Sequence, residues 1–194
     1  MSEKNKKLEA LKNEIEADRL LPLQESNIVF GEGNCDSDII FIGEAPGFEE
    51  DRQKRPFVGR SGQLLNQMLG DIGMSRDEVY ITNIVKRRPT NNRDPLPEEI
   101  QAYKPYLAKQ LDIIRPLIVI TLGRFAMNYF LPDAKITRDQ GVLFRKNNFF
   151  VIPMFHPAAA LRSQTEVMGR FKETFRKLPV MIKKCKQYQG VKDK

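Results

Sequence analysis

Residues 39–51, IIFIGEAPGFEED, place a run of apolar side chains directly before a turn rich in glycine, proline and acid. The run at 39–42 is typical of a strand buried on both faces, as in a parallel sheet. The turn lacks the G-x-G-x-x-G pattern of a dinucleotide site, and the chain has no Walker A lysine motif. Glycine with proline favours a rigid turn with exposed backbone N–H groups, which suits a small planar or anionic ligand.

Further apolar runs follow, separated by segments of helical period. Three of them read as buried strands, at residues 79–85, 117–122 and 149–155. Apolar spacings of three and four predict helices over residues 64–72 and 100–114, and a shorter helix beginning at Gly123. The alternation predicts a three-layer α/β/α domain with a central parallel sheet of about four strands.

The two ends of the chain have charged helical patterns. We expect an N-terminal helix over about residues 3–20 and a basic C-terminal helix over about residues 164–188. No linker or repeat divides the sequence, so residues 1–194 are expected to form a single domain.

Composition excludes several classes of protein. With 41% hydrophobic and 29% charged residues the chain is globular, and no apolar run is long enough to span a membrane. The charged start does not resemble a signal peptide, and two cysteines, Cys35 and Cys185, cannot build a disulfide framework. We therefore expect a cytoplasmic protein, and since nothing in the sequence demands an oligomer, we expect a monomer.

The net charge of +7 is unevenly distributed. Residues 170–194 account for all of it, and a basic tail of this kind is more often a solvated helix face than a nucleic-acid site. Two local clusters are more informative, because each follows a predicted strand and so belongs at the same edge of the sheet. They are Arg52, Lys54, Arg55 and Arg60, and Lys86, Arg87, Arg88 and Arg93.

Polar side chains stand at the ends of two predicted strands. The single histidine, His156, follows the run at 149–155, and Asn83 ends the run at 79–85. Carboxyl ends of parallel strands meet at the crevice where such sheets bind ligands, although many lone histidines are only hydrogen-bonded structural residues. An asparagine offers a donor and an acceptor to the edge of a nucleobase. Phe57 could supply a stacking face, or simply pack in the core.

Four ordered motifs resemble one known family. GEAPG at 43–47 with acidic residues after it, RPFVGRSGQLL at 55–65, VYITNIVK at 79–86 and PMFHPAAAL at 153–161 resemble the uracil-DNA glycosylase superfamily, most closely its family 4, the thermophile-type prokaryotic branch. The likeness runs from about Val29 to Arg162. It implies a monofunctional DNA glycosylase of base excision repair, which flips deoxyuridine out of double- or single-stranded DNA and hydrolyses its N-glycosidic bond to release uracil.

The resemblance also assigns roles in uracil recognition. It implies that Phe57 stacks on uracil, that Asn83 bonds to its Watson–Crick edge and rejects cytosine, and that His156 lies near uracil O2, where negative charge grows as the base departs. By the same likeness Glu50 crowds the 5-position and excludes the methyl group of thymine. The wall of the pocket is formed by Gly43, Glu44, Ala45 and Pro46.

Hydrolysis also needs a group that positions or deprotonates the attacking water. Better-known members of the superfamily carry an aspartate where this chain has Ala45, so Glu44 is the leading candidate to position or deprotonate the water. The alternative is that Glu44 only braces the turn. A weak nucleophile can trap an oxocarbenium-like state, so loss of Glu44 could be partial.

DNA contacts are expected around the same edge. By resemblance, Ala159 and its alanine neighbours approach the minor groove, Leu161 wedges into the gap left by the flipped base, and Arg162 binds a phosphate. The alternative is a plain helix start after the proline that follows His156. We also expect DNA contacts from the first helical turn at Ser61, and from two residues of the second basic cluster, Arg87 and Arg88.

The chain departs from family 4 in its cysteines. Members usually ligate an iron–sulfur cluster with four, but Arg87 and Tyr103 occupy two matching places here, and the matching amino-terminal region, 14–23, has none. We predict no cofactor and no metal. A related branch uses a covalent histidine that this chain lacks. Two alternatives stay open: a catalytically weak or inactive uracil-DNA or DNA-binding protein of the same fold, and a small α/β enzyme acting on free nucleotides.

Overall fold

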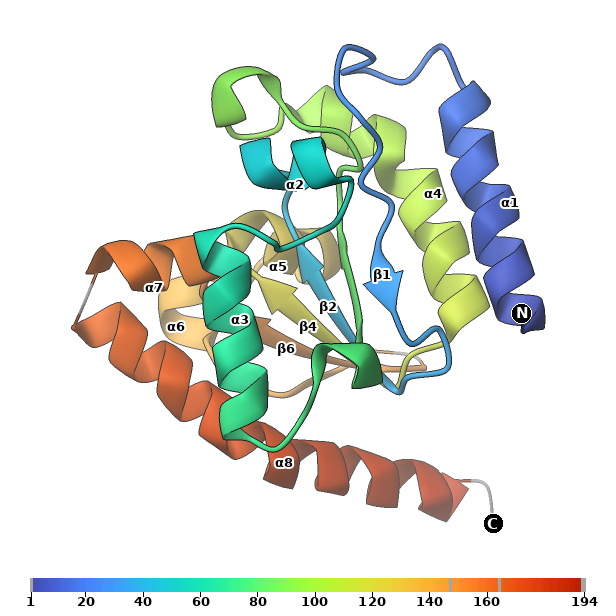
Figure 1. The fold of residues 1–194 in the computed structure, drawn as a ribbon. Helices are drawn as coiled ribbons and strands as arrows, with labels where there is room; N and C mark the ends of the chain where they lie inside the picture. The colour runs from blue at the N-terminus through green and yellow to red at the C-terminus, as the bar shows by residue number, and fades with distance from the viewer. Residues whose placement is uncertain (1, 147, 164, 193–194) are drawn as a thin grey trace.

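A six-stranded sheet between two layers of helices forms the body of the molecule in the computed structural model, which describes residues 2–146, 148–163 and 165–192 (Figure 1). The strands are β1 (Glu32–Gly33), β2 (Ile39–Gly43), β3 (Tyr80–Asn83), β4 (Ile118–Leu122), β5 (Phe144–Arg145) and β6 (Phe150–Met154). The helices are α1 (Glu3–Ala17), α2 (Phe48–Gln53), α3 (Arg60–Asp71), α4 (Pro97–Ile114), α5 (Arg124–Phe130), α6 (Ile136–Asp139), α7 (Pro157–Ser163) and α8 (Glu166–Lys192), with single 3₁₀ turns at Arg76–Glu78 and Thr90–Asn92.

The strand order is β1-β3-β2-β4-β6-β5. The four central strands run parallel, with Gly43 opposite Asn83 and Leu122 opposite Met154, so their carboxyl ends finish at one edge. The predicted parallel sheet of four strands is therefore confirmed. Two edge strands, β1 and β5, pair antiparallel and were not predicted. Each has two residues and no apolar run, so hydrophobic periodicity could not reveal them.

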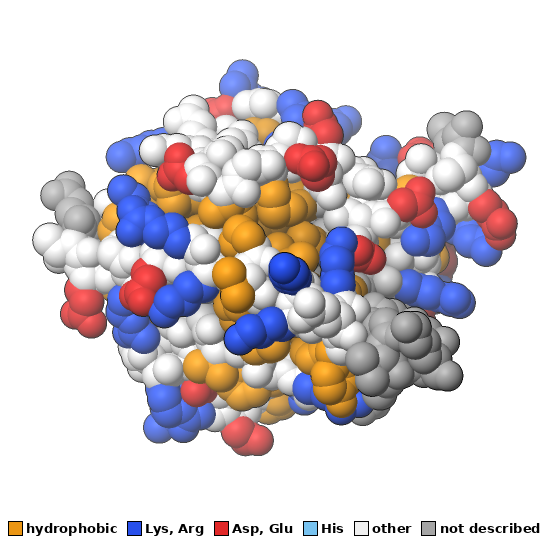
Figure 2. Space-filling model, turned by 90° about the horizontal axis from the view of Figure 1, so that it is seen from below, with side chains coloured by type: hydrophobic (Ala, Val, Ile, Leu, Met, Phe, Trp, Pro, Cys, Tyr) orange, Lys and Arg blue, Asp and Glu red, His pale blue; other side chains and the backbone are white. Residues whose placement is uncertain are grey.

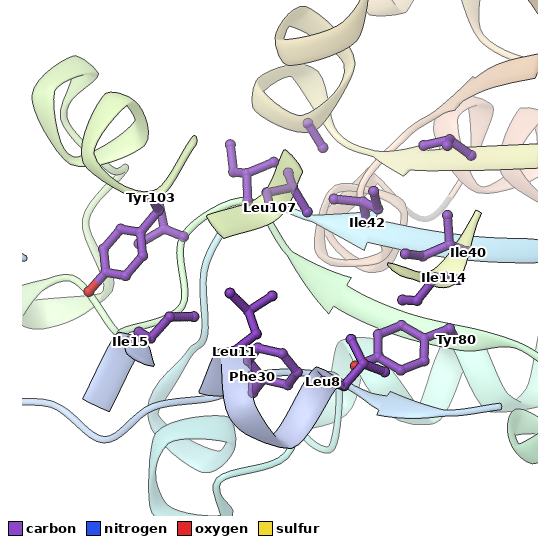
Figure 3. Packing of buried hydrophobic residues seen from close by; sticks show 14 of the residues in the cluster. Leu8, Leu11, Ile15, Phe30, Ile40, Ile42, Tyr80, Tyr103, Leu107 and Ile114 are labelled. Atoms are coloured by element: carbon purple, nitrogen blue, oxygen red, sulfur yellow. The ribbon is translucent and has the colours of Figure 1, made fainter. Parts of the chain in front are cut away.

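Each face of the sheet has its own hydrophobic core. On one face α1 and α4 cover β2, β3 and β4, and Leu11, Tyr103 and Ile42 meet in the cluster drawn in Figure 3. On the other face α3, α7 and α8 pack against the sheet, with Leu65 and Phe171 fully buried. Figure 1 shows these two helical layers on opposite sides of the strands. The predicted three-layer α/β/α arrangement is confirmed.

The terminal helices differ in their bounds from the prediction. Helix α1 ends at Ala17 and not near residue 20, because Asp18 leaves helical geometry. The predicted basic C-terminal helix is α8, which begins at Glu166 and ends at Lys192, a few residues beyond the predicted end. The predicted start at residue 164 lies outside the described residues, as do residues 1, 147, 193 and 194 of the predicted domain. No helix in the described ranges is long and apolar enough to cross a membrane.

The underside of the molecule is mixed in chemistry. Figure 2 shows hydrophobic side chains gathered in the middle of this face, with Lys and Arg side chains scattered around them among acidic ones. The basic residues there form no continuous surface of one sign. This distribution favours a solvated helix face for the basic C-terminal segment, as the sequence suggested.

Candidate active site

A pocket of about 740 Å³ opens at the carboxyl ends of the parallel strands. Its walls come from the turn after β2, the first turn of α3, the end of β3, the loop that precedes α4, and the start of α7. Most of the residues assigned to the uracil site line it: Glu44, Ala45, Pro46, Glu50, Phe57, Asn83 and His156. The sheet topology therefore brings together side chains separated by more than a hundred residues in the sequence.

Asn83, the last residue of β3, lines this pocket. It is 2% exposed, and its Oδ1 has no hydrogen-bond partner within the described residues. Gly43 lies opposite, where a Cβ would stand 2.4 Å from both Asn83 Oδ1 and Phe57 Cζ. A buried amide oxygen without a partner costs about 1–3 kcal/mol, so it indicates a ligand group that arrives with a donor. Gly43 lines the pocket by leaving space and not by a side-chain contact.

Phe57 is held beside Asn83 in a constrained turn. Its φ is 52°, in the left-handed region, and its ring lies 5.8 Å from the His156 ring. Glu50 Oε1 accepts the backbone N–H groups of Val58 and Gly59 at 2.9 and 2.8 Å, and Arg76 donates to the carbonyl oxygen of Phe57 at 3.1 Å. Left-handed geometry at a bulky residue stores about 1–3 kcal/mol of strain, which indicates positioning beyond ordinary core packing.

His156 stands at the end of β6 in its neutral form. Its Nδ1 accepts the backbone N–H of Ala158 at 3.1 Å, which assigns the remaining ring proton to Nε2. Burial, aided by the positive charge of Arg162 and opposed by Glu50, lowers the pKa of His156 to about 4. The ring is therefore a neutral donor throughout the physiological range.

Glu44 has the opposite perturbation. Burial, reinforced by the nearby carboxylate of Asp94 and opposed by Arg124, raises the pKa of Glu44 to about 7. Asp94 and Arg124 pair with each other at 2.6 Å. A carboxyl group with a pKa near neutrality can accept a proton from water under ordinary conditions, so Glu44 has the properties of a general base.

The family model for the Uracil DNA glycosylase superfamily matches residues 30–179. The chain belongs to this superfamily. Its relatives include three proteins named type-4 uracil-DNA glycosylase. That of Sulfurisphaera tokodaii is 41% identical over 93% of this chain and 87% of its own length. The Thermotoga maritima protein is 44% identical over 84% and 88%, and the Archaeoglobus fulgidus protein is 41% identical over 79% and 81%. The resemblance drawn from the motifs is confirmed.

In this uracil DNA glycosylase superfamily member the predicted DNA-contacting residues divide into two groups. Ser61, Ala159 and Arg162 line the pocket, and Arg162 is exposed. Arg88 is half-buried and does not line the pocket, but its guanidinium lies 5.1 Å from the centre of the Phe48 ring, which does. Leu161 does not line the pocket, because it faces the core below α7 and packs there. The structure therefore gives the plain helical interpretation of Leu161 more support than the wedge.

Arg87 is buried in the structure. It is 7% exposed, and its guanidinium donates to the backbone carbonyl of Ser26. It also lies beside the hydroxyl of Tyr103, opposing the rise that burial causes in the pKa of that group. This burial does not favour the predicted contact of Arg87 with DNA, which stays a prediction: sequence marks the residue as basic but does not reveal that tertiary packing buries it.

The residues present do not fit the iron–sulfur cluster that the resemblance to family 4 implies. Arg87 and Tyr103 occupy two of the ligand positions that this resemblance implies. The Tyr103 hydroxyl donates to the carbonyl of Pro22 at 2.9 Å, and the Arg87 guanidinium donates to the carbonyl of Ser26, so polar contacts join both positions to residues 22–26. The two cysteines, Cys35 and Cys185, are buried in the cores on opposite faces of the sheet. Two separated thiols cannot ligate a cluster.

Iron content follows from this arrangement. We expect protein purified either aerobically or anaerobically to contain no stoichiometric iron and to show no visible absorbance band. Iron at one cluster per chain, measured by elemental analysis, would contradict the prediction.

Tyr103→Phe should lower the free energy of unfolding by about 1 kcal/mol, because it removes the hydroxyl that donates from α4 to the carbonyl of Pro22.

Two charged side chains of the pocket were not predicted from sequence. Asp94 and Arg124 line the pocket and shift the pKa of Glu44 in opposite directions, Asp94 adding to the rise that burial causes and Arg124 opposing it. Asp94 lies inside a run of basic and polar residues, and Arg124 follows Gly123 at the start of a short helix. Neither has a motif of its own. Only the position of Gly123, at the end of a predicted strand, indicated that the next residue would face the pocket.

Proposed function

We propose that this chain binds DNA, flips deoxyuridine into the pocket and hydrolyses the N-glycosidic bond to release uracil. The observation that carries this proposal is the pair formed by Asn83, with an unpartnered buried acceptor, and His156, with a neutral Nε2–H, in one pocket. The relatives named type-4 uracil-DNA glycosylase support the same substrate. All the residues invoked belong to one chain, so we propose that a monomer suffices.

The pocket chemistry suits uracil more than cytosine. Oδ1 of Asn83 can accept from uracil N3–H, while its Nδ2 donates to O4. Cytosine presents an acceptor at N3 and a donor at N4, so both contacts would be reversed. Unpaired polar groups in a buried site make such a mismatch strongly unfavourable. Phe57 offers the base a ring to stack on, next to Gly43.

Bond cleavage follows from charge stabilisation. As the bond between C1′ and N1 breaks, its electron pair passes to uracil, and the neutral Nε2–H of His156 donates to O2 as negative charge grows there. A water oxygen then forms the new bond to C1′, and Glu44 accepts the proton of that water. Glu50 takes part by holding the turn that carries Phe57, and its Oε1 is occupied by that task.

The test is base release from a labelled duplex with one U·G or U·A pair, followed by alkaline cleavage of abasic sites. We expect strand cutting at the uracil with the wild-type chain, and free uracil as the second product. Retention of uracil-containing DNA without cutting, or activity only on deoxyuridine monophosphate, would contradict the proposal. Parallel single-stranded substrates would define the preferred form of DNA.

The pH profile tests Glu44. Below pH 7 its carboxyl group is protonated and cannot accept a proton, so the single-turnover rate should rise with pH and level off above about 7. His156 does not titrate in this range, since its pKa is about 4. Glu44→Gln should lower the plateau by about 100-fold and flatten the profile between pH 5.5 and 8. An unchanged profile in this variant would show that Glu44 only braces the turn.

Salt dependence tests Arg162. If this exposed residue binds one phosphate, Arg162→Gln should weaken binding to DNA without regard to sequence, and should reduce the slope of log Kd against log salt by about 0.9. Fluorescence anisotropy with a duplex lacking uracil measures this directly. Arg176→Gln is the matched control, because Arg176 is exposed on α8, away from the pocket. Equal slopes in the two variants would remove Arg162 from the contact surface.

A further inference from the structure

Lys86 is a fully buried lysine directly behind the active site. It is 0% exposed, and its Nζ lies 2.7 Å from Thr82 Oγ1, 2.8 Å from the carbonyl oxygen of Asn83 and 2.6 Å from Gln110 Oε1. The Phe30 ring centre is 5.9 Å away. No ion pair joins Lys86 to an acidic residue in the described part of the chain. Lysine side chains are almost never fully buried without an acidic partner, so the burial of Lys86 needs a physical explanation.

The hydrogen bonds around Lys86 match three protons on its nitrogen. The Thr82 hydroxyl donates its only proton to Phe30 O at 2.7 Å, so it accepts from Lys86. The Gln110 amide nitrogen donates to Phe30 O and to the Tyr80 hydroxyl, which leaves Oε1 as an acceptor facing Lys86. With the carbonyl of Asn83 there are three acceptors. A neutral amine has two N–H groups, whereas the ammonium has three.

This charge has a free-energy penalty. Burial lowers the pKa of Lys86, and a desolvated ammonium is retained only where its hydrogen bonds offset the loss of water. Three short bonds to oriented oxygens provide that compensation. Such a network is fully satisfied and rigid, and it fixes the backbone to which it is attached.

Lys86 binds the end of β3 at Asn83, where β3 is no longer paired with strand β1. Strand β1 pairs only with Tyr80 and Ile81, so the outer side of β3 has no strand opposite Asn83. Lys86 supplies the donor that a neighbouring strand would otherwise give to the Asn83 carbonyl. The hydrogen bond from Lys86 reaches the Asn83 backbone on the face of the sheet covered by α1 and α4, where Figure 3 shows Phe30 and Tyr80. The Asn83 side chain lies in the pocket beside Phe57.

We propose that Lys86 is a positioning residue for uracil excision: its ammonium holds the backbone of Asn83, and thereby fixes the carboxamide that meets the flipped base. This inference rests on the proposed function. Lys86 contacts no substrate atom. It acts by fixing the direction of the two hydrogen bonds that Asn83 offers to uracil, of which the one donated to O4 strengthens as negative charge develops on the leaving base. A small misplacement of such a group lowers the rate strongly.

The first experiment is Lys86→Met, which keeps an unbranched chain of similar length and removes all three donors. We expect kcat for uracil release to fall about 10- to 100-fold, with KM changed less than about threefold. Substrate with 5-fluorouracil in place of uracil supplies the decisive readout. Because fluorouracil leaves more readily as an anion, it needs less help from Asn83, and the loss should be about tenfold smaller. A merely structural defect would reduce both rates equally.

A matched pair of threonine variants keeps the test independent of folding. Thr82 and Thr121 pair with Ile42 from its two sides, and both are fully buried. Thr82 binds Lys86, whereas Thr121 Oγ1 has no partner among the described residues. Thr→Val preserves shape in each case. We expect Thr82→Val to lower kcat about three- to tenfold for uracil and less for fluorouracil, and Thr121→Val to leave both rates unchanged.

The outcomes separate the two proposals. Wild-type activity with a selective loss in Lys86→Met and Thr82→Val supports the positioning role. Equal losses on both bases, equal effects of the two threonine variants, or full activity in Lys86→Met would overturn it while leaving uracil excision intact. A wild-type chain that releases no uracil would overturn the proposed function and, with it, the role given to Lys86.

Discussion

Asn83→Ala is expected to lower kcat/KM for uracil excision about 10²- to 10³-fold without destabilising the protein. The carboxamide of Asn83 lines the pocket, and its Oδ1 is buried with no partner in the described residues, so it can read the Watson–Crick edge of the base. Removing a preorganised hydrogen-bonding group from such a site costs about 3–4 kcal/mol in the transition state. Uracil would still stack on Phe57 but would lose its orientation.

The stability of this variant distinguishes a binding group from a structural one. Because Asn83 Oδ1 has no hydrogen-bond partner among the described residues of the free protein, alanine removes a buried acceptor without breaking a hydrogen bond to it. We expect the free energy of unfolding to stay the same or to rise by up to about 1 kcal/mol. Denaturant unfolding measures it, alongside single-turnover base release. Activity retained within threefold, or a loss of several kcal/mol in stability, would contradict the assignment.

The parts of the site that sequence predicted are those fixed by the sheet. Asn83 and His156 end buried apolar runs, and parallel pairing brings such ends to one edge. This rule depends only on strand order and direction, so it survives errors in the exact bounds of helices. Gly43 could be predicted by the same rule, because it also ends a buried apolar run. The structure adds the reason for a glycine there: a Cβ would occupy the space between Asn83 and Phe57.

The parts that sequence could not predict depend on tertiary burial of charge. Lys86, Arg87 and Arg88 are adjacent and equally basic, yet the first two are buried and the third is only half-buried. Their surroundings come from Gln110 and Ser26, which are distant in the sequence. Glu50 is a similar case: its carboxylate holds the Phe57 turn through two backbone N–H groups, a contact that no motif encodes.

His156→Ala is expected to lower kcat about 10²- to 10³-fold with a small effect on KM. The Nε2–H donates most strongly when the base carries negative charge, so its loss falls on the transition state more than on substrate binding. Since the ring is neutral, with a pKa of about 4, the remaining rate should keep the pH dependence set by Glu44 near 7. A variant that shifted this dependence would indicate that His156 is charged during the reaction.

Two further substitutions identify which ring nitrogen matters. Glutamine at position 156 can place an amide N–H near the position of Nε2, whereas asparagine reaches only the position of Nδ1, which accepts from the backbone of Ala158. We therefore expect kcat of His156→Gln to be about tenfold higher than that of His156→Ala. His156→Asn should restore the hydrogen bond from the Ala158 N–H at the start of α7 but recover little activity. The reverse order would mean that the ring acts by capping α7, with Nε2 unused. Both amide side chains are uncharged at all accessible pH values. Activity recovered by either of them would therefore show that a neutral donor suffices, and the neutral ring is the form that burial favours for His156.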